Sequence, residues 1–247
     1  MIIGSNIIYR EKLSSTNALA AQMLSSNRPE EGTLIYAYEQ SEGKGQKGNS
    51  WISEPGKNLT VSIILYPDFL EAGQQFMISK AVSLAIAELL DDYSASISIK
   101  WPNDIYHKDD KIAGILIENA LEGNKIVNTI IGTGININQT IFPPALPNPV
   151  SLKILNKREY HPEKMLSAFC RIFDLWYGRL RSGHLSNINE PYLERLYRFN
   201  ETAEFSTAGG DRLQGRIAGV DSFGRLIIES TEGNLSYYGF REIEFRH

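Results

Sequence analysis

The sequence predicts an α+β fold in which a mixed β-sheet is flanked by helices and followed by a small all-β unit. Two apolar segments of strand length, residues 33–38 and 59–65, are joined by a glycine-rich loop with no helix between them, which favours a mixed sheet. From about residue 199, short strand-like segments alternate with glycine-containing turns, and this pattern is typical of a small β-barrel. We therefore expect two domains, residues 1–198 and residues 199–247.

The other elements of the first domain follow from apolar spacing and from residues that start or stop helices. A helix over residues 17–24, capped by Ser14 or Ser15, precedes the first strand. Prolines exclude helix and strand over residues 142–149, which must form a loop. Helical spacing predicts helices over residues 76–89, 162–180 and 192–196, and apolar runs predict strands over residues 96–100, 111–118 and 126–132.

Composition limits the possible classes of function. The 247 residues include 25 Lys and Arg and 29 Asp and Glu, so no global basic field is available for non-specific nucleic-acid binding. No signal peptide is recognisable, and no stretch approaches the roughly 18 uncharged apolar residues of a membrane span. The single cysteine, Cys170, lies among apolar helical residues, which favours a buried thiol. We expect a soluble cytoplasmic protein without a nucleic-acid or membrane partner.

The glycine-rich loop matches the pattern Gly-x-Gly-x-x-Gly from Gly43 to Gly48, and Asp68 lies twenty residues further on. A dinucleotide-binding fingerprint requires a helix directly after the glycines, whereas Trp51, a turn and a second strand follow here. The loop is locally basic and free of acidic residues. Two interpretations stay open, a plain hairpin connection and a cradle of backbone N–H groups and lysines for an anion.

Three further segments place small or polar residues at the ends of predicted strands. Residues 100–104 read Lys-Trp-Pro-Asn-Asp, residues 111–118 begin with a lysine, and residues 132–138 read Gly-Thr-Gly-Ile-Asn-Ile-Asn. Each segment alone is most simply a turn. Because they share one predicted sheet with residues 15–17 and Gln40, we expect a ligand-binding crevice.

In this combination and order, the motifs resemble those of the biotin–protein ligases over nearly the whole chain. They are the glycine loop ending in Trp51, the Lys-Trp-Pro-Asn-Asp segment, Lys111 with Gly114, and Gly132-x-Gly134-x-Asn136. The resemblance implies a catalytic domain of the class II aminoacyl-tRNA synthetase and biotin ligase type, followed by an SH3-like β-barrel. It also implies a biotin–[acetyl-CoA-carboxylase] ligase of the short form, without an N-terminal DNA-binding domain.

The resemblance further implies a two-step reaction. The family condenses biotin with ATP to biotinyl-5′-adenylate and pyrophosphate, then transfers biotin to a lysine of a biotin carboxyl carrier protein. Mg²⁺ is expected to arrive with ATP, with no metal site formed by the protein alone, and a homodimer is compatible with the family. Because a carboxylate must approach a phosphate, fixed positive charge should dominate catalysis, and Lys111 matches the family's catalytic lysine.

The resemblance also implies which residues contact the two substrates. Neutral polar side chains suit the ureido ring of biotin, and an asparagine amide offers the donor and acceptor that an adenine edge requires. The biotin-binding residues are expected to be Ser15, Thr16, Asn17, Gln40, Gly43, Lys44, Gln46, Trp51, Lys111, Gly114 and Gly134. The residues for ATP and the adenylate are expected to be Gly45, Lys47, Gly48, Asn49, Asn103, Asn136, Glu242 and Arg246. Trp101 is interpreted as a core residue.

One departure and two alternatives accompany this interpretation. Well-studied bacterial members carry arginines at the positions of Lys44, Gln46 and Asn49, so we expect the loop to retain the adenylate less tightly here. A lipoate or octanoate ligase or transferase is one alternative, although Ser15 and Gln40 suit a polar ring better than a linear chain. A non-catalytic biotin-binding regulator is the other, and the presence of Lys111 argues against it.

Overall fold

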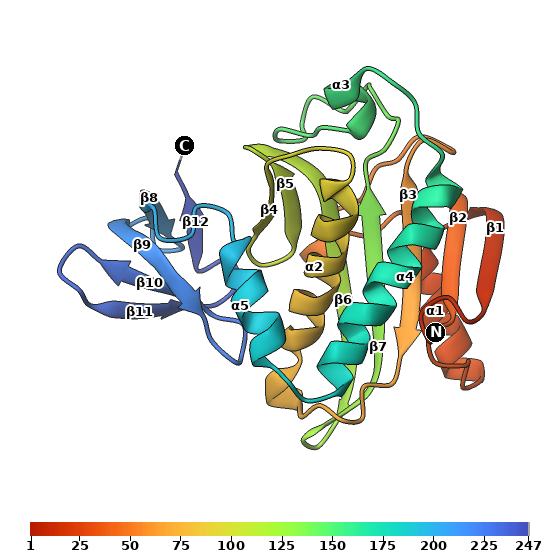
Figure 1. Ribbon diagram of the computed structural model, residues 1–247, viewed down its shortest axis with the longest axis horizontal. Helices are drawn as coiled ribbons and strands as arrows, with labels where there is room; N and C mark the ends of the chain where they lie inside the picture. Colours follow the sequence, from red (N-terminus) through yellow and green to blue (C-terminus); the bar gives the residue numbers. More distant parts are fainter. Residues whose placement is uncertain (247) are drawn as a thin grey trace.

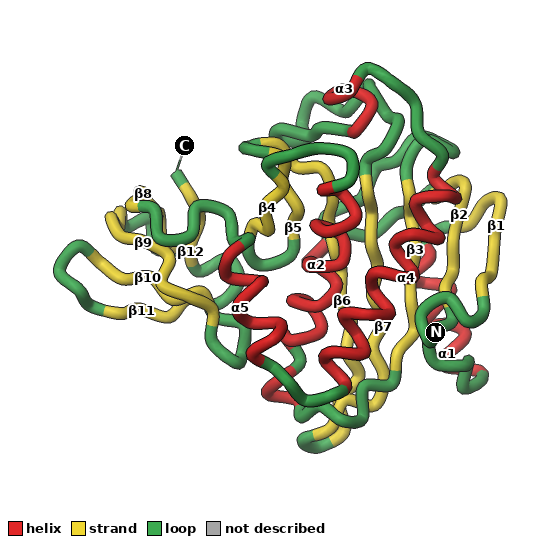
Figure 2. The backbone as a smooth tube through the Cα atoms, viewed as in Figure 1, coloured by secondary structure: helices red, strands yellow, loops and turns green. Residues whose placement is uncertain are grey.

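The structure, a computed structural model, describes residues 1–246 apart from the side chain of Lys47. Its main body is a seven-stranded sheet in the order β1-β2-β3-β7-β6-β5-β4 (Figures 1 and 2). β1 runs parallel to β2, and every other neighbouring pair is antiparallel, so the predicted mixed sheet is confirmed. The strands are β1 (Ile7–Leu13), β2 (Leu34–Gln40), β3 (Leu59–Leu65), β4 (Ile97–Lys100), β5 (Asp104–His107), β6 (Asp110–Glu122) and β7 (Lys125–Ile135).

Helices cover the two faces of this sheet unequally (Figure 1). α1 (Thr16–Ser26) packs on one face against β2, β3 and β7, whereas α2 (Phe76–Asp91) and α4 (Pro162–Arg181) pack together on the other. Thirteen of the sixteen residues of α2 are buried, and each fully buried Leu or Ile stabilises the fold by roughly 1.5–3 kcal/mol. α2 is therefore the central element of the core. None of the helices in the described part of the chain is long and apolar enough to cross a membrane.

The face that carries α1 lacks side chains at three neighbouring strand positions. Gly132 lies opposite Ser62 of β3, and Gly134 lies opposite Gly114 of β6. Side chains alternate between the faces of a strand, so Gly132 and Gly134 share a face, and added β-carbons there would meet Asn17 and Trp51. The sheet is thus hollowed beside the start of α1.

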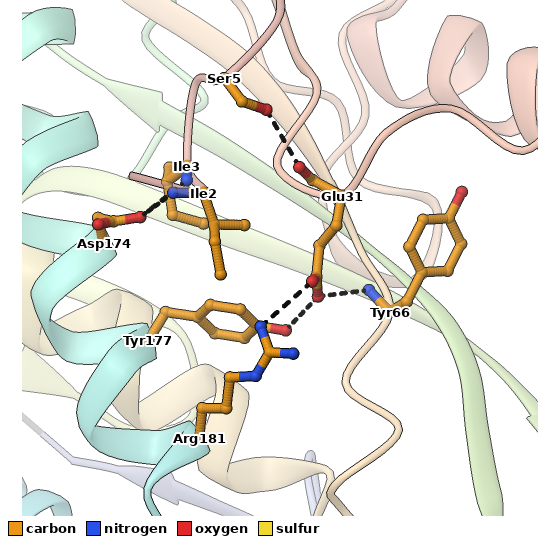
Figure 3. Close-up of polar contacts among 8 residues, drawn as sticks. All are labelled: Ile2, Ile3, Ser5, Glu31, Tyr66, Asp174, Tyr177 and Arg181. Atoms are coloured by element: carbon orange, nitrogen blue, oxygen red, sulfur yellow. Dashed lines mark hydrogen bonds and ion pairs between the residues drawn. The ribbon is translucent and has the colours of Figure 1, made fainter.

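The segment before β1 is fixed to α4 by polar contacts (Figure 3). One carboxylate oxygen of Asp174 accepts hydrogen bonds from the backbone N–H groups of Ile2 and Ile3, at 2.5 and 2.9 Å. Glu31, in the connection to β2, accepts a 2.7 Å hydrogen bond from the Tyr177 hydroxyl, and burial raises the pKa of that phenol. These contacts hold the chain entering β1 and β2 against the helical layer.

The C-terminal unit is a five-stranded antiparallel sheet in the order β11-β10-β9-β8-β12. β11 and β12 form its edges, so the sheet is not closed by a ladder between them. It contacts the main body where the indole N–H of Trp101 donates to the Gly224 carbonyl oxygen at 2.9 Å. The strands are β8 (Thr202–Thr207), β9 (Arg212–Val220), β10 (Leu226–Ser230), β11 (Leu235–Tyr238) and β12 (Ile243–Phe245).

The expected helices and strands are present, and the structure adds several short or polar elements. β1 is a mostly exposed edge strand without an apolar alternation, β5 has four residues, α3 (Leu152–Asn156) has five, and a 3₁₀ turn covers Ala72–Gln74. The expected helix over residues 192–196 is wrong in its bounds, because α5 covers Ser186–Glu194 with Pro191 inside it. A proline commonly marks a helix start, and the segment before it is polar.

Candidate active site

A cavity of about 220 Å³ occupies the hollow beside the start of α1. Its walls come from the first residues of α1, the end of β2, the glycine-rich loop, the β4–β5 connection, the first half of β6 and the end of β7. Predicted site residues in these walls are Ser15, Thr16, Asn17, Gln40, Lys44, Gly45, Gln46, Asn49, Trp51, Asn103, Lys111, Gly114 and Gly134. The structure thus brings most of the predicted residues together in one place.

One end of the cavity is polar and built on the N-terminus of α1. Ser15, Thr16 and Asn17 are all buried. The Gln40 amide oxygen accepts hydrogen bonds from the backbone N–H of Thr16 at 2.7 Å and from its hydroxyl at 3.1 Å. A free N–H of the first helical turn is satisfied in this way by a side chain from the end of β2. The contact fixes the orientation of the amide and leaves the two N–H donors of Gln40 for a ligand.

A second layer of polar residues fixes Asn17. Its amide oxygen accepts from the hydroxyl of buried Ser62 at 2.5 Å, and its amide nitrogen donates to Glu118 at 2.6 Å. A β-carbon on Gly132 would lie 2.3 Å from the Asn17 amide oxygen, so this position requires glycine. Ser62 and Glu118 were not predicted as site residues. Ser62 alternates with apolar residues on β3, whereas Glu118 follows three apolar residues on β6 without such a pattern.

The middle of the cavity is an apolar slot formed by Trp51 and two glycines. A β-carbon on Gly134 would lie 2.2 Å from the Trp51 ring, and one on Gly114 would lie 3.1 Å from it. The backbone N–H of Trp51 donates to the Gly43 carbonyl oxygen at 2.8 Å, which anchors the indole at the end of the loop. Its ring N–H is buried and has no hydrogen-bond partner among the described residues, so a ligand can accept from it.

The other end of the slot carries a lysine and a carboxylate. Nζ of Lys111 lies 2.8 Å from Oδ1 of Asp104, and both side chains are partly exposed. The same Nζ lies 5.9 Å from the centre of the Trp51 ring. Asp104 stands opposite Gly114 in the β5–β6 ladder, next to the slot. Asp104 belongs to the Lys-Trp-Pro-Asn-Asp segment but was not predicted as a site residue, so the structure adds it to the site.

The glycine-rich loop forms a hairpin over the cavity. Lys44 and Ser50 form an antiparallel bridge, and the N–H of Gly45 donates to the Asn49 carbonyl oxygen at 2.7 Å. Between them lies a 3₁₀ turn, Gln46–Gly48, in which Gly48 has a φ of +86° that favours glycine. The loop is therefore a hairpin and also a wall of the cavity. The prediction for the Lys47 side chain lies outside the described residues.

The other predicted nucleotide residues lie at different depths. Asn103 lines the cavity and donates its amide N–H to the Ile115 carbonyl oxygen at 2.7 Å. Asn136 is buried outside the walls, and its amide oxygen has no partner among the described residues. Glu242 accepts from the Gly239 N–H at 2.6 Å, and Arg246 lies 3.5 Å from Glu204, so both contact the C-terminal sheet and neither lines the cavity.

Carboxylates are scarce around this cavity. Asp104 is the acidic residue in its walls, and it is paired with Lys111. Across residues 1–246, no group of three or more His, Cys, Asp and Glu side chains is arranged to hold a metal ion. The site is therefore suited to a ligand with a polar head, an apolar middle and an anionic end, since the polar group, the slot and the lysine follow in that order.

The fold and the cavity together define an enzyme-type domain with a site of small-molecule size between buried polar side chains and a lysine. Residues 9–136, more than half of the chain, match the model of the Biotin/lipoate A/B protein ligase family. The chain belongs to this family.

Individual proteins agree with this assignment. The chain is 29% identical to the bifunctional ligase/repressor BirA of Bacillus subtilis over 96% of its own length and 73% of the relative. It is 28% identical to the biotin–[acetyl-CoA-carboxylase] ligase of Paracoccus denitrificans over 81% of its length and 85% of the relative. The structure of the Aquifex aeolicus biotin protein ligase in complex with biotin and ATP has the same fold, with a TM-score of 0.80, 23% identity, and coverage of 98% of this chain and 99% of that one.

Proposed function

We propose that this protein is an ATP-dependent biotin protein ligase that forms biotinyl-5′-adenylate and transfers biotin to a lysine of a carrier protein. The observation that carries the proposal is the apolar middle of the cavity, where Trp51 packs on the glycines of β6 and β7, with Lys111 at one end and Gln40 at the other. Biotin has the matching sequence of groups, a ureido ring, an apolar chain and a carboxylate. The family membership and the named relatives support the same activity.

The polar end of the cavity suits the ureido ring. The ring presents one carbonyl acceptor and two N–H donors, and burying them without partners costs several kcal/mol. Gln40 can donate to the carbonyl, because its own amide oxygen is occupied by Thr16. The hydroxyl of Ser15 and the unpaired ring N–H of Trp51 provide further polar atoms along the path.

The lysine end suits the adenylation step. A biotin carboxylate oxygen attacks the α-phosphorus of ATP, the new O–P bond forms, and the bond to the β-phosphate bridging oxygen breaks, so pyrophosphate leaves with the electron pair. Both reacting groups are anionic, so they repel each other as they approach. An ammonium placed between them lowers this repulsion, and its effect is larger in a site of low polarity than in water. Lys111 performs this task, and Asp104 holds its Nζ in place before the anions arrive.

We assign the nucleotide to the loop side of the cavity. Asn49 and Asn103 line this side, Asn136 supplies a buried amide oxygen behind it, and the loop hairpin closes over it. Mg²⁺ bound to ATP would take its ligands mainly from phosphate oxygens and water, which is how this ion is held when proteins offer few carboxylates. Asp104 is the carboxylate in the walls and would be the side chain that holds such an ion.

Transfer completes the reaction. The carrier lysine amine attacks the carbonyl carbon of the adenylate, an amide bond forms, AMP leaves, and the amine loses a proton. We infer that the catalytic domain comprises residues 1–198 and that the five-stranded sheet from Thr202 onward is the small SH3-like barrel domain of the family. The proposed partner is a biotin carboxyl carrier protein.

The experiment is pyrophosphate release by the purified chain with ATP and Mg²⁺, in the presence of biotin or of lipoate. Release with biotin, lost in Lys111→Ala and kept in the exposed control Lys125→Ala, is the expected result. Release with lipoate instead assigns the chain to the lipoate branch of the family. Biotin binding without pyrophosphate release from either acid identifies a non-catalytic regulator, and both outcomes overturn the proposal.

A further inference from the structure

A chain of hydrogen bonds runs from the protein surface to the polar end of the cavity. It begins at Glu118 of β6, whose exposed carboxylate accepts from the Asn17 amide nitrogen at 2.6 Å. The Asn17 amide oxygen lies 2.5 Å from the Ser62 hydroxyl oxygen, which lies 2.7 Å from the hydroxyl oxygen of Thr16. Asn17, Ser62 and Thr16 are buried, so these contacts are shielded from water. The chain ends at Thr16, in the wall of the cavity.

Glu118 fixes the direction in which the hydrogens of this chain point. A carboxylate accepts hydrogen bonds and donates none, so the NH₂ group of Asn17 must face it. The amide oxygen of Asn17 then faces Ser62, which uses its single hydroxyl hydrogen on that oxygen. Ser62 therefore has no hydrogen left for Thr16, and in the contact between the two hydroxyls the Ser62 oxygen can only accept.

The hydroxyl hydrogen of Thr16 is also used inside the protein. It has two acceptors, the Ser62 oxygen at 2.7 Å and the Gln40 amide oxygen at 3.1 Å. With the hydrogen on either of them, the oxygen of Thr16 keeps its lone pairs for the cavity. This end of the cavity thus offers N–H donors from Gln40 and, beside them, a hydroxyl acceptor from Thr16.

We propose that Glu118 is a positioning residue that makes this end of the cavity selective for a ring with an N–H group beside its carbonyl group. This inference rests on the proposed function, in which the ring is the ureido ring of biotin. Gln40 donates to the carbonyl oxygen, and the adjacent ring N–H donates to the oxygen of Thr16. A ring that has an oxygen atom in place of this N–H meets the lone pairs of Thr16 and is rejected, because both oxygens lack a hydrogen to share.

The selectivity depends on the carboxylate of Glu118, because an amide in its place removes the constraint. A glutamine donates as well as accepts, so the Asn17 amide becomes free to turn over and present its NH₂ group to Ser62. Ser62 would then donate to Thr16 and occupy one lone pair of its oxygen. The ring N–H would lose its best acceptor, whereas a ligand without that N–H would lose nothing.

The test measures the affinity of Glu118→Gln for biotin and for its two cyclic carbamate analogues by isothermal titration. Each analogue has an oxygen in place of one of the two ring N–H groups. We expect the dissociation constant to rise about fivefold for biotin and for one carbamate, the difference between a charge-assisted and a neutral hydrogen bond, and to stay within about twofold for the other. Glu122→Gln, exposed on the same strand, is the matched control and should change none of the three.

A second variant tests the path through Ser62. In a Ser62→Ala background, Glu118→Gln should change biotin affinity by less than about twofold, because no hydroxyl hydrogen is left to redirect. Three results overturn the inference: unchanged biotin affinity in Glu118→Gln, an equal loss for biotin and both carbamates, as a merely structural residue would give, or a loss that persists in the Ser62→Ala background. A wild-type chain that binds no biotin would instead reject the proposed function, so the two failures are distinguishable.

Discussion

Gly134→Ala should weaken biotin binding by roughly 30- to 150-fold while leaving the protein folded. An added β-carbon would lie 2.2, 2.5 and 2.6 Å from three atoms of the Trp51 indole. Carbon atoms pack at about 3.5–4.0 Å, so the ring must retreat by roughly 1.3 Å or more. The ring is only partly buried and sits at the end of a loop, so it can swing out of the slot. The sheet itself need not move.

The cost of this retreat falls on ligand binding. Overpacking a filled space costs typically 1–3 kcal/mol, and loss of the indole wall removes about 1.5–3 kcal/mol of apolar burial from the ligand. We therefore expect biotin affinity to fall by about 2–3 kcal/mol, which is roughly 30- to 150-fold. Folding stability should change little, because alanine restricts the unfolded chain more than glycine and gains about 0.4–1 kcal/mol.

Isothermal titration with biotin and urea unfolding measure the two effects separately. Gly114→Ala is the matched control on the facing strand, where the added carbon lies 3.1 Å from the ring and 3.3 Å from a flexible part of Lys111. Its expected loss is below about 1 kcal/mol, or fivefold. In a Trp51→Ala background, Gly134→Ala should cost less than about 0.5 kcal/mol, because the clashing partner is absent. Biotin affinity of Gly134→Ala within threefold of wild type, or a cost that persists without Trp51, refutes the steric argument.

Three further predictions follow from single contacts. Asp104→Asn should slow adenylate formation about tenfold in single-turnover assays with little change in biotin affinity, because Lys111 loses its fixed partner; an unchanged rate contradicts this. Gln46→Arg should slow the release of the adenylate by about tenfold in a filter-retention assay, and an equal off-rate counts against it. Lys80 is 2% exposed, and burial lowers its pKa to about 8. Its protonated form therefore destabilises the fold by about 3 kcal/mol below pH 8. This cost disappears as the pH rises toward 10.5, the pKa of the lysine in the unfolded chain. Lys80→Met should therefore raise the free energy of unfolding at pH 7 by about 1–3 kcal/mol, measured by urea titration. The free energy of unfolding of the variant should also increase less than that of the wild type between pH 8 and 10.5. A variant less stable than the wild type at pH 7 would contradict the reasoning.

The fold was predictable in the segments where buried positions give the sequence a clear pattern of apolar residues. β3 is buried at all seven positions and was predicted with its observed bounds, 59–65. α4 shows a continuous apolar stripe and was expected at 162–180 against the observed Pro162–Arg181. β1 was missed, since its side chains are mostly exposed and its pairing with β2 depends on backbone hydrogen bonds, which leave no side-chain pattern.

The candidate site was predictable to the extent that its residues lie in motifs. Trp51, Lys111 and Gly134 were assigned from the sequence, and all of them line one cavity. Glu118 and Ser62 could not be assigned in this way, because their role is to orient Asn17 and depends on contacts between residues 101 and 45 positions apart. Such supporting contacts depend on the register of β3, β6 and β7, and this register could not be predicted from the sequence.

The distribution of cations explains how this chain can work with a glycine-rich loop that has few charges. The loop carries Gln46 and Asn49 where an anion would approach, and amides bind phosphate without neutralising it. Lys111, by contrast, is attached to a strand and fixed by the Asp104 carboxylate. Cations that are held in place before the substrate binds need no reorganisation when charge develops, and this favours catalysis more than mobile loop charges do. The rate of adenylate formation in this protein should accordingly depend on Lys111, whereas the loop should affect mainly how long the adenylate stays bound.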